Sequence, residues 1–282
     1  MTSRLDYLTY HFGLCSWSLQ PTSPRDLVDK VRRVGVPGVQ LALDPIRTGA
    51  WPLDETREAI AGAGIDIVSG MMAMAGEDYS TLESIKRTGG VAPDETWTAN
   101  LDAAHALAQI AAMLDLPLVT FHAGFIPHEV SDPNRGVMLD RLRQLAEVYR
   151  AAGVRLAFET GQETAETLLA ALDELDRPEV GVNFDPANMI LYGMGDPIDA
   201  LRRLAPRLAQ IHIKDAIASK TPGQWGREVR AGTGDVDWPA FFSMMRDKHI
   251  DCDLMIEREA GGDRIADMIA GRELVEHLRS ST

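Results

Sequence analysis

Short apolar runs alternate with longer amphipathic segments along nearly the whole chain. Apolar runs of about five residues predict buried strands, and apolar residues spaced three or four positions apart predict helices. Strands are expected at residues 13–17, 39–43, 65–71, 118–122, 154–159, 180–184, 208–214 and 252–257. Helices are expected at residues 23–34, 54–63, 97–114, 135–152, 164–175, 197–204, 238–246 and 264–277.

Eight strand–helix units predict a single (β/α)8 TIM barrel that occupies residues 1–282. Strands that alternate with helices favour a parallel sheet, and eight units in 282 residues match the size of a closed barrel. An open, doubly wound sheet is the alternative, and it usually has a glycine-rich turn after its first strand. The segment after Trp17, SLQPTSP, has no glycine, so the closed barrel is favoured. No stretch has the composition of a linker, which favours one domain.

Composition and charge narrow the functional classes. A net charge of -14 disfavours binding to nucleic acid, because phosphate backbones are repelled. The only cysteines, Cys15 and Cys252, lie in apolar runs and are expected to be buried free thiols. The N-terminus does not resemble a signal peptide, and no apolar run is long enough to span a bilayer. We therefore expect a cytoplasmic protein that does not interact with membranes.

Two connections are longer than ordinary loops, at residues 73–95 and 216–237. Both follow the C-terminal ends of predicted strands, the face of a barrel where active sites form. We expect them to form a lid or the walls of a substrate site. The pair Gly232 and Gly234 in the second connection has no GK[ST] after it, so it predicts a turn rather than a phosphate loop.

Four ionisable residues interrupt or end four consecutive apolar strands. They are Glu159, Asp185, His212 and Glu257, and a barrel would bring them together around its axis. Buried charges are costly unless they are paired or bind a metal. Three carboxylates and one imidazole predict a site for one divalent ion, either Mn²⁺, Mg²⁺, Co²⁺ or Zn²⁺.

The motifs around these residues resemble the xylose isomerase-like barrel superfamily. They are FET at Glu159, NFDPAN at Asp185, IHIKD at His212 and IE at Glu257, together with the stretch AGTGDVDWPAFFSMM. The resemblance implies that the four residues are the metal ligands and that Glu159 and Glu257 are the catalytic acid/base pair. It also implies a sugar or sugar-phosphate isomerase or epimerase of carbohydrate metabolism that works through an enediolate. Members of such families are dimers or tetramers, so the resemblance also implies a homo-oligomer.

Several alternatives stay open within the resemblance. Ketose 3-epimerases typically have His where this chain has Asn188, which puts that assignment in doubt. A lyase or dehydratase acting on a keto-sugar, a keto-glycoside or an inosose would use the same proton abstraction. A sugar-binding barrel without chemistry is a third hypothesis. DNA endonucleases on this scaffold bind three zinc ions through additional histidines, and the MMAMAG segment and the acidic charge disfavour that class.

Other polar or aromatic residues near the predicted site are candidates for contact with the small carbohydrate substrate. The simpler interpretation is that they pack in the core or are solvated surface charges. These candidates are His122, Lys214, Asn188, Arg227, Arg230 and Trp17, with Gln40 and Gln162 as weaker ones. Three further histidines fall on predicted helices or connections and are expected at the surface or in packing: His105, His249 and His277.

Overall fold

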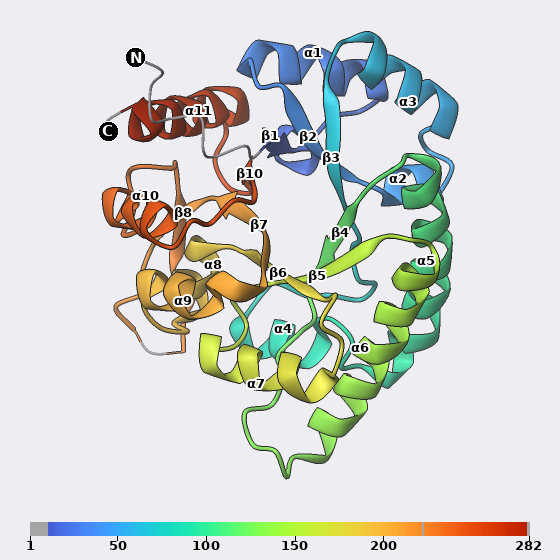
Figure 1. Cartoon of the computed structure of the whole chain (residues 1–282), viewed down its shortest axis with the longest axis vertical. Coiled ribbons are helices and arrows are strands. Elements are labelled where there is room, and N and C mark those ends of the chain that lie inside the picture. The colour runs from blue at the N-terminus through green and yellow to red at the C-terminus, as the bar shows by residue number, and fades with distance from the viewer. Residues whose placement is uncertain (1–10, 222, 281–282) are drawn as a thin grey trace.

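Eight parallel strands close into a barrel at the centre of the molecule (Figure 1). This computed structural model describes residues 11–221 and 223–280. The barrel order is β1-β10-β7-β6-β5-β4-β3-β2, so each strand lies beside its neighbours in the chain, as the sequence predicts. The strands are β1 (Phe12–Cys15), β2 (Gly38–Ala42), β3 (Asp66–Met71), β4 (Leu118–Phe121), β5 (Arg155–Glu159), β6 (Gly181–Phe184), β7 (Leu208–Ile213) and β10 (Asp253–Ile256).

An outer ring of helices covers the barrel (Figure 1). Its members are α1 (Pro24–Val34), α3 (Leu53–Gly62), α5 (Asp94–Met113), α6 (Pro133–Ala151), α7 (Ala165–Leu175), α9 (Pro197–Leu204), α10 (Trp238–Asp247) and α11 (Arg264–Ser280). Among the described residues, no helix combines the length and the apolar character needed to cross a membrane.

Local signals in the sequence fix where helices begin and end, and α1 is an example. The Ser23 side chain accepts a hydrogen bond from the backbone N–H of Asp26 at 3.2 Å, and Pro24 occupies the first turn. Gly35 ends the helix with a φ of 82°, a left-handed conformation that glycine adopts without strain.

The barrel interior is polar near the strand ends that carry the predicted site. Gln40 donates a hydrogen bond to Thr120 at 2.8 Å, linking β2 to β4. Ser69 donates to Gln210 at 2.5 Å, and Gln210 donates to Asn183 at 3.3 Å. These side chains are fully buried, and their mutual hydrogen bonds satisfy groups that would otherwise be costly inside the barrel. They form a fixed floor beneath the site.

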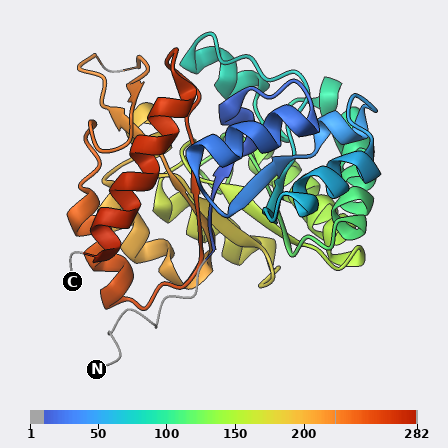
Figure 2. The ribbon, with the colours of Figure 1, turned by 90° about the horizontal axis from the view of Figure 1, so that it is seen from above.

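The connections on the C-terminal face contain more regular structure than the sequence predicts. The first long connection contains α4 (Leu82–Thr88), and α5 begins inside it at Asp94. The second contains an antiparallel hairpin of β8 (Asp215–Ile217) and β9 (Arg227–Val229). Figure 2 shows α4 and this hairpin at the same end of the barrel. Short elements that complete the fold are η1 (Ser16–Leu19), α2 (Asp44–Arg47), α8 (Pro186–Tyr192) and η2 (Ala205–Arg207).

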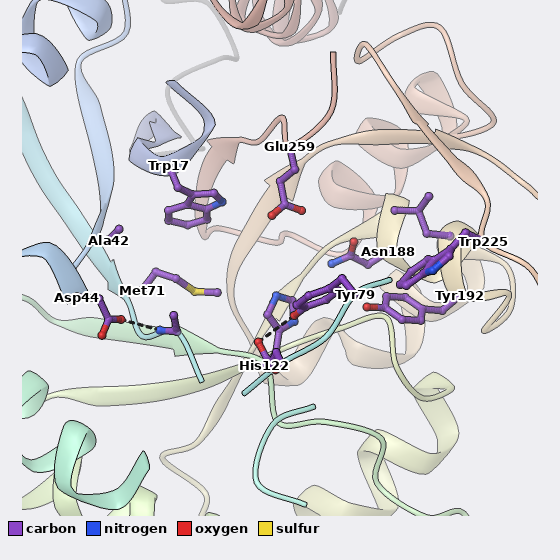
Figure 3. Close-up of a pocket in the computed structure, with 13 residues that line it drawn as sticks. Trp17, Ala42, Asp44, Met71, Tyr79, His122, Asn188, Tyr192, Trp225 and Glu259 are labelled. Atoms are coloured by element: carbon purple, nitrogen blue, oxygen red, sulfur yellow. Dashed lines mark hydrogen bonds between the residues drawn. The ribbon is translucent and has the colours of Figure 1, made fainter. Parts of the chain in front are cut away.

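The first strand is shorter than predicted, and this changes the setting of Trp17. β1 ends at Cys15, and Trp17 belongs to η1 instead of the strand end. The chain turns here because Gln20 closes the 3₁₀ turn in the left-handed region, with its N–H donating to the Trp17 carbonyl. The turn places the indole of Trp17 over the end of the barrel (Figure 3).

Candidate metal and active site

The four charged residues predicted from strand ends lie together at one end of the barrel. Glu159 ends β5, Asp185 follows β6, His212 lies in β7 and Glu257 follows β10. Their candidate ligand atoms all lie within 4.8 Å of one another. All four residues are buried, because the C-terminal ends of parallel strands meet at the same edge of the barrel.

The residues present fit a divalent cation. Nδ1 of His212 lies 3.2 Å from Oε2 of Glu257, 3.5 Å from Oε1 of Glu159 and 3.7 Å from Oδ2 of Asp185. Of these atoms, Nδ1 of His212, Oε2 of Glu257 and Oδ2 of Asp185 have no hydrogen-bond partner within the described part of the chain. Buried polar atoms without a partner are rare in proteins. Three carboxylates and an imidazole that converge in this way suit Mn²⁺, Mg²⁺, Co²⁺ or Zn²⁺.

The opposite side of the His212 ring faces the polar floor of the barrel. Nε2 of His212 lies 2.8 Å from Oε1 of Gln40 and 3.0 Å from Nδ2 of Asn183. Cys15 Sγ lies 3.6 Å from the same nitrogen. Burial raises the pKa of the Cys15 thiol to about 12, so without a metal ion the thiol stays protonated. The ring therefore presents Nδ1, and not Nε2, to the carboxylates.

Asp185 is held by the start of a helix that the sequence does not predict. Its Oδ1 accepts a hydrogen bond from the N–H of Asn188 at 2.9 Å and so caps α8, where Pro186 stands in the first turn. Oδ2 is left facing His212. Burial raises the pKa of Asp185 to about 6, against the opposing effect of Lys214.

Glu159 and Glu257 have separate hydrogen-bond partners. Glu159 accepts from Nδ2 of Asn188 at 2.9 Å, and His122 Nε2 lies 3.8 Å from it. Glu257 accepts from Nε1 of Trp17 at 2.7 Å and forms an ion pair with Lys214 at 3.0 Å. Burial alone would raise both pKa values. His122 and His212 lower the pKa of Glu159, and Lys214 and His212 lower that of Glu257 well below its usual range. Both carboxyl groups are therefore held in the ionised form.

A cavity of about 520 Å³ opens at this end of the barrel, and Figure 3 shows the side chains around it. Three predicted substrate-contact residues line it: Trp17, His122 and Asn188. Four other lining residues were not predicted from the sequence, and they belong to separate connections: Tyr79, Tyr192, Trp225 and Glu259. Tyr79 and Trp225 could have been proposed from the sequence, because they are aromatic residues in the two long connections that follow strands.

The remaining candidates lie in different surroundings. Lys214 is buried beside the cluster, with Nζ 2.6 Å from Glu259 and 3.2 Å from Oδ1 of Asn188. Arg227 and Arg230 are exposed on and after β9 and do not belong to the lining of the cavity. Between them, the side chain of Glu228 is buried and forms an ion pair with Arg258.

The structure also places the weaker candidate Gln162, the two cysteines and the remaining predicted histidines. Gln162 lies 3.5 Å from the hydroxyl of Tyr192 and lines a neighbouring cavity. Cys15 and Cys252 are free and buried, as predicted. The three peripheral histidines are all exposed, which confirms their expected surface positions: His105, His249 and His277.

A model of the family described as xylose isomerase-like TIM barrel matches residues 28–280. The crystal structure of a xylose isomerase domain protein from Planctomyces limnophilus is 33% identical, with a TM-score of 0.84. That match covers 89% of this chain and 92% of the other. Other solved structures, each below 20% identical, include sugar epimerases and a probable dehydratase, and they share the fold.

Two curated relatives match parts of the chain. The uncharacterized protein YihM of Escherichia coli is 30% identical over 109 residues, which are 38% of this chain and a third (33%) of that relative. The 3-oxo-isoapionate decarboxylase of Pectobacterium atrosepticum is 23% identical over 214 residues, which are 73% of this chain and 75% of that enzyme.

Proposed function

Because the chain belongs to the xylose isomerase-like TIM barrel family, we propose that it is a divalent-metal-dependent isomerase or epimerase that acts on a small keto-sugar through an enediolate. The observation that carries this proposal is the cluster of Glu159, Asp185, His212 and Glu257, in which three buried ligand atoms have no hydrogen-bond partner in the described chain and Lys214 is the neighbouring cation. Within this cluster, Glu159 and Glu257 are ionised carboxylates that can act as general bases.

The four cluster residues would hold the ion. A bound divalent ion would supply positive charge against the negative charge that develops when a carbon beside a carbonyl loses its proton. Both glutamates are ionised and can therefore accept that proton. Glu159 ends β5 and Glu257 follows β10, and β6 and β7 separate these two strands in the barrel, so the two carboxylates approach the cluster from different sides. One glutamate removes the proton, and the other returns it to the opposite face or to the neighbouring carbon.

Neighbouring side chains would hold the two bases in position. Asn188 donates a hydrogen bond to Glu159 and accepts one from Lys214, so it links the Glu159 carboxylate to the buried ammonium group of Lys214. Trp17 fixes Glu257 through its indole N–H. His122 lies at the edge of the cavity near Glu159, where it can donate a hydrogen bond to a substrate hydroxyl.

A lyase is the second candidate. The position three residues after Asp185 is Asn188 instead of the His typical of ketose 3-epimerases, and one curated relative is a decarboxylase. A dehydratase or a lyase that eliminates a substituent would share the proton abstraction, whereas a decarboxylase would reach the enediolate by loss of carbon dioxide. Product analysis separates the two classes, because an isomerase or epimerase leaves the substrate mass unchanged, whereas a lyase releases water, carbon dioxide or an aglycone.

Metal analysis and one substitution test the shared chemistry. We expect purified protein to bind about one divalent ion per chain, and we expect Glu257→Gln to slow exchange of solvent deuterium into substrate about 100-fold or more, since a positioned base contributes that much. Glu58→Gln, an exposed change on α3, is the matched control and should leave exchange unchanged. Unaltered exchange in Glu257→Gln would refute the role of this base and favour a sugar-binding barrel.

A further inference from the structure

The wall of the cavity carries negative charge and aromatic rings. Asp44, Glu77 and Glu259 line it, and among the described lining residues there is no lysine or arginine. Tyr192 and Trp225 stack edge to face with ring centroids 4.7 Å apart, and Tyr79 and Trp17 contribute further rings (Figure 3). A phosphate ester entering this cavity would meet carboxylates of like charge.

Lys214, the buried lysine beside the cluster, already has carboxylate partners. Nζ of Lys214 forms ion pairs with Glu259 at 2.6 Å, Glu257 at 3.0 Å and Asp185 at 3.7 Å. Three carboxylates surround the ammonium group of Lys214, so it already has partners before a substrate binds, although Glu257 and Asp185 are also the proposed metal ligands.

Side-chain carboxylates of this chain occupy the place where many TIM barrels bind phosphate. That place is built from backbone N–H groups in the loops after the seventh and eighth barrel strands. After β7, the carboxylate of Asp215 accepts hydrogen bonds from the N–H groups of Gly232 (2.9 Å), Gly234 (3.0 Å) and Val236 (3.2 Å). It also accepts from the indole of Trp238 at 3.0 Å. The donors in the GTG turn are therefore used within the protein.

In the loop after β10, a carboxylate of the chain likewise binds the backbone N–H groups. Oε1 of Glu228 accepts from the N–H groups of Glu259 at 2.9 Å and Ala260 at 3.3 Å, and it pairs with Arg258 at 2.7 Å. The other side of Arg258 binds Asp267 at 2.8 Å. The first turn of α11 is also capped internally, because Asp263 accepts from the N–H of Ala266 at 3.1 Å.

We infer that the substrate of the proposed enolisation is an uncharged keto-sugar or keto-glycoside that carries no phosphate, with its apolar surface against Trp17, Tyr79, Tyr192 and Trp225. This inference rests on the proposed function and sharpens it. Asp215 and Glu228 act as built-in anions, and they exclude a phosphate from the backbone donors that would otherwise recognise it. The aromatic rings provide the apolar contact area that replaces charge recognition.

Matched pairs of substrates test the inference with the metal-loaded full chain. The panel contains D-fructose and D-allulose, their 6-phosphates, and a 3-keto-glucoside. Solvent-deuterium exchange reports enolisation, and quenching of tryptophan fluorescence reports binding, since Trp17 and Trp225 line the cavity. We expect at least about tenfold tighter binding and faster exchange for the neutral member of a pair, from charge repulsion alone.

The outcomes separate this inference from the proposed function. Equal or better binding or exchange of the phosphorylated member would overturn the inference and leave enolisation standing. Binding of a neutral sugar in preference to its phosphate, but without exchange, would overturn the enolisation proposal and leave only the preference for an uncharged ligand standing. If no member of the panel binds or exchanges, both fail.

A charge substitution provides a second measurement. Glu259→Gln removes one lining carboxylate and releases Lys214 from one ion pair. We expect it to improve the affinity for the phosphorylated member relative to the neutral one by about tenfold. Glu58→Gln, an exposed change outside the cavity lining, should leave this ratio unchanged. An unchanged ratio in Glu259→Gln would show that the carboxylates do not set the selectivity.

Discussion

At the scale of single residues, Gln40 presents an acceptor to the nitrogen of His212 that faces away from the carboxylates. Its Oε1 lies 2.8 Å from Nε2 of His212, and its own amide nitrogen donates to Thr120 at 2.8 Å. The bond to Thr120 fixes the amide orientation, so the oxygen faces the ring and favours hydrogen on Nε2, whereas the amide nitrogen of Asn183, 3.0 Å from Nε2, favours a lone pair there. With hydrogen on Nε2, Nδ1 keeps its lone pair for a metal ion. Outer partners of this kind orient ligands and raise metal affinity.

Replacing Gln40 with Met should weaken metal binding without removing a ligand. Met has a similar length but no acceptor, so the tautomer and the ring orientation are released. We expect a loss of affinity of about 10- to 100-fold, measured by calorimetric titration of the metal-free protein. Gln144→Met on the exposed face of α6 is the matched control. Unaltered affinity in Gln40→Met, with circular dichroism like the wild type, would refute this positioning role.

At the scale of elements, the β8–β9 hairpin depends on one buried carboxylate. Asp215 begins β8, and its side chain collects backbone N–H groups from the segment after β9. The close approach requires a glycine at position 234, because a Cβ there would lie 2.1 Å from Oδ1 of Asp215. The long second connection is thus an ordered wall, and the predicted turn at Gly232 and Gly234 wraps around this carboxylate.

Asp215→Asn should loosen this hairpin. The amide removes the charge and one acceptor while keeping the shape, so at least one buried N–H loses its partner. We expect the free energy of unfolding to fall by about 1.5–3 kcal/mol, the range for hydrogen bonds to a charged group. Hydrogen exchange should quicken in residues 227–237. Asp235→Asn, an exposed change in the same segment with one backbone contact, is the control. Equal protection in both variants would contradict this account.

At the scale of the whole molecule, folding keeps one carboxyl group of this acidic chain, that of Glu163, in the neutral form. Glu163 follows β5 and lines the second cavity, of about 850 Å³, together with Phe125 and His128. It is 7% exposed, and burial raises its pKa to about 8. In the unfolded chain the group ionises near its usual pKa of 4.5. Between these two values the folded state holds a proton that the unfolded state has lost.

Stability should therefore fall as the pH rises from about 5 to 8 and level off above that range, since the folded state binds the additional proton. Glu163→Gln removes the titration. We expect it to raise the free energy of unfolding at pH 8 by about 1–3 kcal/mol and to change it little at pH 5. Denaturant unfolding at both pH values measures this. Glu166→Gln, exposed beside the same cavity, should show no such difference. A pH-independent effect of Glu163→Gln would contradict a neutral carboxyl.

The sequence by itself determined the barrel and the four residues at its centre. Strand and helix periodicity is local, and parallel strands bring their C-terminal ends to one edge whatever the loops do. A strand end occupied by Glu159 or Glu257 can therefore be placed without knowing any distant contact. The same reasoning correctly places His122 at the cavity, because it follows β4 directly.

Only the tertiary structure decided what surrounds that centre. Tyr79, Tyr192, Trp225 and Glu259 belong to four different connections, and no local pattern tells which loop tips converge on one cavity. The exposed positions of Arg227 and Arg230 follow from the pairing of β8 with β9. The partners of the buried charges are likewise long-range contacts, which depend on the closed barrel and cannot be read from neighbours in the chain.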